Sequence, residues 1–185
     1  MTDEELVRRW KQGDMQAFDE LYTRYKDDAY RVACLVTGNC SDGEDLTQEA
    51  FVTCAQSISS LRDGSKFRPW LLKTLTRLAW KYCRKKRRET PEAELIGTGQ
   101  EESALSAVLR TDEQKRLYNA LYTLDEKRRT AVILYYYNEL SVHEIAEATG
   151  VIEGTVKSRL FSARRHLRQA LTDNTEEAKE AVNHG

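Results

Sequence analysis

The sequence predicts an all-α protein with two small helical domains, an N-terminal helical bundle and a C-terminal helix-turn-helix domain, joined by a flexible linker. Apolar residues recur at spacings of three and four through most of the 185 residues, and only two prolines interrupt them. After the first domain, expected over 1–88, the chain becomes acidic and glycine-bearing, which is typical of a linker over 89–103. Within 141–171, a short capped helix, a glycine-containing turn and a basic helix follow one another.

The first part of the chain shows strong helical periodicity. Helices are expected over 3–12 and 14–37, the second closed by Gly38 as a C-terminal cap. Ser41 followed by Glu44 has the spacing of a capping box, which predicts that a third helix begins there. The inner face of that helix is formed by Leu46, Ala50, Cys54, Ile58 and Leu61. Its early turns carry acidic residues, which the helix dipole alone would explain without a partner.

The segment 67–88 carries two stripes on one expected helix, and the loop 61–66 precedes it. An apolar stripe, typical of a core face, is formed by Phe67, Leu71, Leu75, Leu78 and Tyr82. The opposite stripe is formed by Trp70, Lys73, Thr76, Arg77, Trp80, Arg84 and Arg87. Cations interleaved with tryptophan are typical of a surface that stacks bases and neutralises phosphates. The alternative is a solvated basic helix whose tryptophans pack on a neighbouring element.

The second domain is expected over 104–171. Its expected elements are helices over 104–122 and 125–138, a short helix over 141–149, a turn over 151–154 and a long basic helix. Ser141 and Glu144 form a second capping box, and Gly150 ends the short helix. These spacings and caps predict a helix-turn-helix.

The long basic helix has a core face formed by Val156, Leu160, Ala163, Leu167 and Ala170. Its opposite face carries Phe161 among serines and cations, which is typical of a helix that lies in a major groove and contacts a thymine methyl group. The alternative is the end of a helical bundle with a solvated basic face. The acidic tail over 172–185 is expected to fray.

The charge is arranged in blocks that the net charge of -1 conceals. Residues 61–88 carry 11 lysines and arginines against 1 acidic residue, whereas 1–60 carry 6 against 12. This alternation predicts a basic binding surface between acidic segments that face a different partner.

Composition excludes several classes of protein. Nothing resembles a signal peptide or a membrane span, so a cytoplasmic protein without direct membrane insertion is expected. Four cysteines, Cys34, Cys40, Cys54 and Cys83, show neither a CxxC pair nor histidines at metal spacing. They are expected to be reduced and mostly buried, and no metal or other cofactor is predicted.

Four segments in this order resemble an extracytoplasmic-function sigma factor of the bacterial sigma-70 family. They are GDMQAFDELYTRY (13–25), DGEDLTQEAF (42–51), FRPWLLKTLTRLAWKYCRKKRR (67–88) and LSVHEIAEATGVIEGTVKSRLFSARRHL (140–167). The resemblance implies a region 2 domain, a linker and a region 4 domain. It also implies that the chain binds core RNA polymerase and directs initiation at promoters, without being an enzyme or binding a small-molecule substrate.

The resemblance assigns roles by matching position. The surface for core polymerase, at the beta-prime clamp helices and the beta subunit, is matched by Asp45, Leu46, Gln48, Glu49 and Phe51. Minus-10 DNA binding and capture of a flipped base are matched by Arg62, Ser65, Lys66, Phe67, Trp70, Lys73, Arg77, Trp80, Lys81 and Arg84. Minus-35 reading is matched by Thr155, Lys157, Ser158, Arg159, Phe161, Ser162 and Arg165. An inhibitory anti-sigma factor is a further implied partner.

Three positions depart from the family pattern. Arg77 stands where many relatives have asparagine, Ser162 where arginine is common, and Tyr135 where a phosphate-binding arginine often precedes the helix-turn-helix. The promoter sequence is therefore not carried over from the family.

Two other functions fit parts of the sequence. A stand-alone helix-turn-helix regulator would be dimeric, but no apolar heptad seam is present and the basic-aromatic helix would be unexplained. A nuclease or recombinase could use the acidic pairs Asp27-Asp28 and Glu44-Asp45 to hold a metal ion. Both pairs fall in helical stretches, where surface charge explains them, and no nucleophile is placed beside them.

Overall fold

The computed structural model describes residues 1–89 and 111–183, with side chains as far as Thr172. Within these ranges the regular structure is helical, which confirms the all-α class. The helices are α1 Asp3–Lys11, α2 Met15–Thr37, α3 Cys40–Ser57, α4 Phe67–Glu89, α6 Asp112–Tyr122, α7 Glu126–Val132, α8 Val142–Thr149 and α9 Glu153–Asn183. Three short segments complete them: the 3-10 turns η1 Ile58–Ser60 and η2 Gly64–Lys66, and the π-helical turn η4 Ile133–Tyr137. The predicted linker lies outside the described residues apart from Glu89, as does the first part of the helix expected over 104–122.

Local capping chemistry sets most helix ends as expected. Ser141 accepts a hydrogen bond from the main-chain nitrogen of Glu144 and completes the predicted capping box. Gly38 and Gly150 adopt left-handed conformations with φ of 79° and 69°, so both close their helices as predicted.

Three boundaries differ from the prediction. The cap of α3 is Asn39 rather than Ser41, because the Asn39 side chain accepts hydrogen bonds from the main-chain nitrogens of Ser41 and Asp42. Helix α9 begins at Glu153, which shortens the expected turn. It then continues to Asn183, so most of the expected tail over 172–185 is part of α9.

The N-terminal bundle, α1–α4, encloses an aromatic and aliphatic core. Leu6, Leu21 and Phe67 are fully buried. The Trp10 ring lies 4.9 Å from the Phe18 ring and 6.2 Å from the Phe67 ring, centroid to centroid. Burial of these large side chains, at roughly 25 cal/mol per Å² of apolar surface, holds the four helices together.

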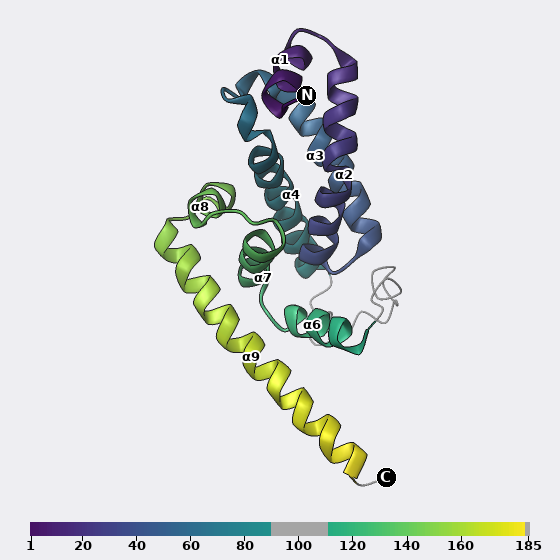
Figure 1. The fold of residues 1–185 in the computed structure, drawn as a ribbon, viewed down its shortest axis with the longest axis vertical. Helices are drawn as coiled ribbons and strands as arrows, with labels where there is room; N and C mark the ends of the chain where they lie inside the picture. Colours follow the sequence, from purple (N-terminus) through teal and green to yellow (C-terminus); the bar gives the residue numbers. More distant parts are fainter. Residues whose placement is uncertain (90–110, 184–185) are drawn as a thin grey trace.

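The C-terminal domain, α6–α9, forms the predicted helix-turn-helix. Ile145 of α8 and Val156 and Leu160 of α9 are buried where the two helices cross, and α7 packs against α9. Figure 1 shows α9 as a long helix that extends beyond the rest of the domain.

The C-terminal domain packs directly on the N-terminal bundle, with α8 beside α4 (Figure 1). Buried residues from both parts form one continuous hydrophobic cluster. This contact corrects one expectation about the basic stripe of α4. Thr76 is 0% exposed, and Trp80 is half-buried with its indole nitrogen donating a hydrogen bond to Thr130 of α7.

Candidate functional site

The acidic face of α3 is divided between exposed and buried members. Asp45, Gln48 and Glu49 are exposed, whereas Leu46 and Phe51 are buried. The Phe51 ring packs edge-on against Tyr22 of α2, with 4.8 Å between centroids. Leu46 and Phe51 therefore position the helix, and the three polar side chains remain available to a partner.

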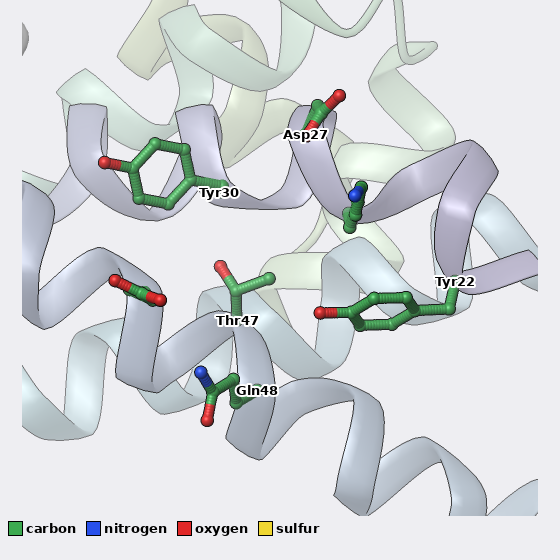
Figure 2. A pocket seen from close by; sticks show the side chains of 7 residues that line it. Tyr22, Asp27, Tyr30, Thr47 and Gln48 are labelled. Carbon is green, nitrogen blue, oxygen red and sulfur yellow. The ribbon is translucent and has the colours of Figure 1, made fainter. Parts of the chain in front are cut away.

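A hollow of about 280 Å³ opens between α2 and α3 next to this face. It is lined by Tyr22, Lys26, Asp27, Tyr30, Glu44, Thr47 and Gln48. Figure 2 shows the labelled side chains around the space, with the Tyr22 hydroxyl directed into it. The pattern of the sequence indicates Tyr22 only as part of a helical apolar face, so the hollow itself was not predicted.

Each of the two acidic pairs considered for metal-dependent chemistry has one residue in the lining of that hollow. These residues are Asp27 and Glu44. Among the residues with described side chains, no group of three or more His, Cys, Asp or Glu could hold a metal ion. The four cysteines are free thiols, and burial raises the pKa of Cys34 to about 12 and that of Cys54 to about 11.

A second hollow, of about 290 Å³, lies at the other side of α3, against α4. Its lining consists of Thr53, Ser57, Ser60, Trp70, Thr74, Arg77 and Leu78. Trp70 and Arg77 were predicted site residues. The hydroxyl residues were missed because three of them come from the end of α3 and from η1, which the sequence pattern marks only as helix end and turn.

The chemistry of the second hollow follows from its hydrogen bonds. The Ser57 hydroxyl donates to Thr53 O at 2.6 Å, and the Thr74 hydroxyl donates to Trp70 O at 3.1 Å. Since these hydroxyl hydrogens are already used, the oxygens present acceptor lone pairs. The exposed guanidinium of Arg77 supplies donors, and the Trp70 ring supplies an aromatic face.

The loop before α4 is ordered by Asp63, whose carboxylate accepts hydrogen bonds from the Ser65 nitrogen at 3.0 Å and the Ser65 hydroxyl at 2.6 Å. These hydrogen bonds lower the pKa of Asp63. The predicted residues Arg62, Ser65 and Lys66 are exposed on this loop, next to the start of α4.

On α4 the predicted minus-10 residues fall into three environments. Arg77, Lys81 and Arg84 are exposed, and Trp70, Lys73 and Trp80 are partly buried. Phe67 is 0% exposed, in ring contact with Trp10, Tyr25 and Trp70. The prediction that Phe67 contacts DNA is therefore corrected: its side chain belongs to the core and supports Trp70.

On α9 most of the predicted minus-35 residues face outward. Lys157, Ser158 and Arg165 are exposed, Phe161 is 68% exposed, and Thr155 and Ser162 are partly exposed. Arg159 differs, since its guanidinium lies 6.0 Å from the centre of the Trp80 ring. Ile152 was not predicted, yet it is 76% exposed directly before α9. An apolar residue at the start of a basic recognition helix was the signal that could have identified it.

Family comparisons match both halves of the chain. The Sigma-70 region 2 model matches residues 21–89, and the Sigma-70 region 4 model matches residues 114–167. The fold and the two matched regions define a two-domain helical factor of the sigma-70 class.

Relatives specify the group further. The ECF RNA polymerase sigma factor SigW of Bacillus subtilis is 31% identical over 94% of this chain and 98% of SigW. The ECF RNA polymerase sigma-E factor of Haemophilus influenzae is 33% identical over 90% of this chain and 94% of its own length. The chain belongs to the extracytoplasmic-function group of RNA polymerase sigma factors. It is an initiation factor that binds core RNA polymerase and directs it to promoters.

Two solved structures are similar in fold. The sigma factor RpoE of Bartonella quintana, in complex with the anti-sigma factor NepR, matches with a TM-score of 0.67 and 25% identity, covering 84% of this chain and 96% of RpoE. CnrH, in complex with the cytosolic domain of CnrY, matches with a TM-score of 0.71 and 21% identity, covering 92% of this chain and 97% of CnrH. The stand-alone regulator is not favoured, because it leaves the region 2 match unexplained. No helix among the described residues is long and apolar enough to cross a membrane.

Proposed function

We propose that this sigma factor opens promoters by holding an unstacked base of the minus-10 element in the hollow formed by α3, η1 and α4. The observation that carries the proposal is the composition of that hollow, where Trp70, Arg77 and acceptor hydroxyls line one space of about 290 Å³. Stacking of a base on an aromatic side chain contributes roughly 1 to 3 kcal/mol, which offsets much of the cost of unstacking it. The exposed Arg62 and Lys66 lie on the adjoining loop and would neutralise phosphates of the same strand.

Duplex reading is assigned to α9. Phe161 and Ile152 provide exposed apolar surface for thymine methyl groups, and Ser158 provides a hydroxyl for base edges. Lys157 and Arg165 are exposed cations that would contact phosphates and set the register of the helix in the groove.

Polymerase binding is assigned to Asp45, Gln48 and Glu49, the exposed polar members of the α3 face. The clamp helices of the beta-prime subunit are the expected partner, and complementary charge would steer the encounter. Since polymerase and promoter DNA are its partners, the cytoplasm is the proposed location. By likeness to RpoE, an anti-sigma factor is a proposed inhibitor.

The decisive experiment is transcription reconstituted from core RNA polymerase, this chain and a library of promoter sequences. We expect selective initiation at templates that share one minus-10 and one minus-35 sequence. Initiation without selectivity, or no initiation while a palindromic duplex is bound tightly in the absence of polymerase, would contradict the proposal.

A further inference from the structure

Helix α1 holds one wall of the hollow that the proposed function gives to the unstacked base. Lys11, in the last turn of α1, donates a hydrogen bond from Nζ to the main-chain oxygen of Leu61. Leu61 is buried and directly follows Ser60, which lines the hollow. The Ser60 hydroxyl donates to Ser57 O at 2.7 Å, which orders the turn η1. The η1 wall of the hollow is therefore tied to α1 by a charged donor.

The loop that follows η1 rests on the same side of α1. Gly64 is buried, and a Cβ atom added to it would lie 2.9 Å from Cα of Glu4 and 3.1 Å from Cβ of Val7. Glu4, Val7 and Lys11 recur at spacings of three and four, so they form one stripe of the helix. Gly64 does not have a positive φ, so its backbone conformation is open to residues with a side chain. The close approach of α1 is what requires glycine at this position.

The outward side of the loop carries the residues assigned to DNA. Arg62 is exposed between the two points of attachment, Leu61 and Gly64, and Ser65 and Lys66 are exposed directly after them. The loop therefore has inward residues that α1 holds and outward residues that meet the minus-10 strand.

The α4 wall of the hollow is also supported from α1. The Trp10 ring lies 6.2 Å from the Phe67 ring, and the Phe67 ring lies 6.2 Å from the Trp70 ring, centroid to centroid. Phe67 is fully buried, and Trp70 lines the hollow. Because protein interiors are closely packed, a buried ring transmits a displacement to its neighbours. Two adjacent residues of α1, Trp10 and Lys11, thus reach the α4 wall and the η1 wall of one hollow.

From these contacts we infer that α1 sets the spacing between the two walls of the base-holding hollow, with Lys11 as a positioning residue and Gly64 as the point where the loop rests on α1. The inference rests on the proposed function, because it takes this hollow as the seat of the base. Lys11 is not part of the lining, so it acts through Leu61 and not on the base. Binding groups must be held within about 0.5 Å of their productive positions, so a loosened wall changes which base is preferred.

Three substitutions test the attachment of the loop. Lys11→Met keeps the aliphatic stem and removes the donor, whereas Lys11→Arg keeps a charged donor. Gly64→Ala places a Cβ atom against the α1 backbone, so the loop must shift. Arg8→Met is the matched control, because it removes a positive charge from the exposed surface of the same helix. Arg8 makes no hydrogen bond or ion pair with residues 61–66.

The first measurement is amide hydrogen exchange of the free full-length chain. Exchange in the loop 61–66 should be faster in Lys11→Met by roughly fivefold, which corresponds to the loss of about one hydrogen bond. Gly64→Ala should also exchange faster there, whereas Lys11→Arg and Arg8→Met should match the native chain. Affinity for core polymerase should be native in every variant, because the residues assigned to that contact lie on α3.

The second measurement is initiation by reconstituted polymerase on templates that carry each of the four bases at the captured position. Lys11→Met should reduce the preference for the best base over the next by roughly fivefold, and Lys11→Arg should restore the native preference. Gly64→Ala should alter the preference in the same direction. A purely stabilising role of Lys11 would lower initiation on all templates equally, and that result would overturn the inference.

Native loop exchange in Lys11→Met would also overturn it, and so would a faster loop with an unaltered base preference. Failure of the proposed function has a different signature. Polymerase carrying the native chain would then show no preference among the four bases, while the loop of Lys11→Met would still exchange faster. The link from α1 to base selection would fall with the proposed function, and the attachment of the loop to α1 would stand.

Discussion

The indole nitrogen of Trp80 donates a hydrogen bond to Thr130 Oγ1 at 3.0 Å and thereby joins α4 to α7. The hydroxyl of Thr130 in turn donates to Glu126 O at 2.6 Å, which fixes the orientation of its lone pairs toward Trp80. A residue that the sequence places on a DNA-binding stripe is therefore held by the other domain.

Substitutions of Trp80 can distinguish its hydrogen bond to Thr130 from the stacking role predicted for its ring. Trp80→Phe removes the nitrogen but keeps an aromatic face on which any base can stack, so promoter opening in the assembled polymerase should remain within about threefold of native. Trp80→Ala removes both and should reduce opening by about tenfold or more. Permanganate reactivity of unpaired thymines measures opening, and binding to core polymerase should be unchanged for both. Equal losses for Phe and Ala would show that the ring face is not used.

The α3 face can be tested by charge reversal. Asp45→Arg combined with Glu49→Arg should weaken binding to core polymerase by roughly tenfold or more. The two exposed acidic groups are expected to face a basic surface of the polymerase, and the arginines would carry the same sign of charge as that surface. Asp19→Arg, on exposed α2 surface, is the control. Affinity for core polymerase is measured by fluorescence anisotropy at physiological salt. Native affinity in the double variant would show that this face does not contact the polymerase.

The hollow on α4 predicts a defect specific to base capture. Trp70→Ala should slow initiation on duplex promoters by about 5- to 100-fold, which corresponds to the loss of one base-stacking contact. Arg77→Ala should change which base is preferred at the captured position, because it removes the donors and leaves the acceptors of Ser57 and Thr74. Lys85→Ala, exposed near the end of the same helix, serves as control. Identical base preference in Arg77→Ala and native protein would exclude Arg77 from base reading.

Recognition by α9 predicts two kinds of loss. Phe161→Ala and Ile152→Ala should each weaken selection of the minus-35 sequence by about tenfold, and Ser158→Ala by less, because one base contact is removed in each case. Arg165→Ala should instead weaken binding to all DNA sequences alike. It should also reduce the slope of log K against log salt concentration by about one. Transcription from matched and mismatched minus-35 templates at several salt concentrations distinguishes the two classes. Unaltered selectivity in Phe161→Ala and Ile152→Ala would indicate that the outward face of α9 is not the reader.

The capping box of α8 predicts a pH dependence of stability. The Glu144 carboxylate accepts hydrogen bonds from the Ser141 nitrogen at 2.9 Å and the Ser141 hydroxyl at 2.8 Å, which lower the pKa of Glu144 from its ordinary value of 4.5. Since the folded pKa is the lower one, this stabilisation is present above the unfolded pKa and is lost as the pH falls from about 4.5 through the folded pKa. Glu144→Gln should show a shallower fall of Tm than native protein over that range, and Glu147→Gln should follow the native curve. Parallel curves for native protein and Glu144→Gln would refute the linkage.

Local features were the ones that the sequence predicted best. Ser141, Gly38 and Gly150 act through their own side chains or backbone within a few residues, so their roles can be inferred without knowing the rest of the fold. Asn39 shows the limit of that reasoning. Two plausible caps lie two residues apart, and the choice between Asn39 and Ser41 depends on where α2 ends and how the chain turns.

Surface exposure on α4 could not be inferred, because it is decided by a domain distant in sequence. The stripe with Thr76 and Trp80 has the composition of a solvent face, yet Thr76 is buried and Trp80 donates a hydrogen bond to Thr130 of the C-terminal domain. For the same reason, only some of the residues that line the hollow around Trp70 were predicted. Its helical members follow from spacing, whereas Ser57 and Ser60 reach it only through the tertiary packing of α3 and η1.

Gly38 leaves space for an aromatic ring from α6 as well as ending α2. A Cβ atom added there would lie 2.7 Å from Cε1 of Tyr122, while the left-handed φ of 79° would still be open to asparagine at modest strain. Asparagine at position 38 would therefore keep the end of α2 but displace the ring that rests on it. Glycine at position 38 therefore does two things at once: it closes α2 with a left-handed residue and leaves room for the Tyr122 ring, so the end of one helix and the seat of a side chain from α6 depend on the same missing Cβ atom.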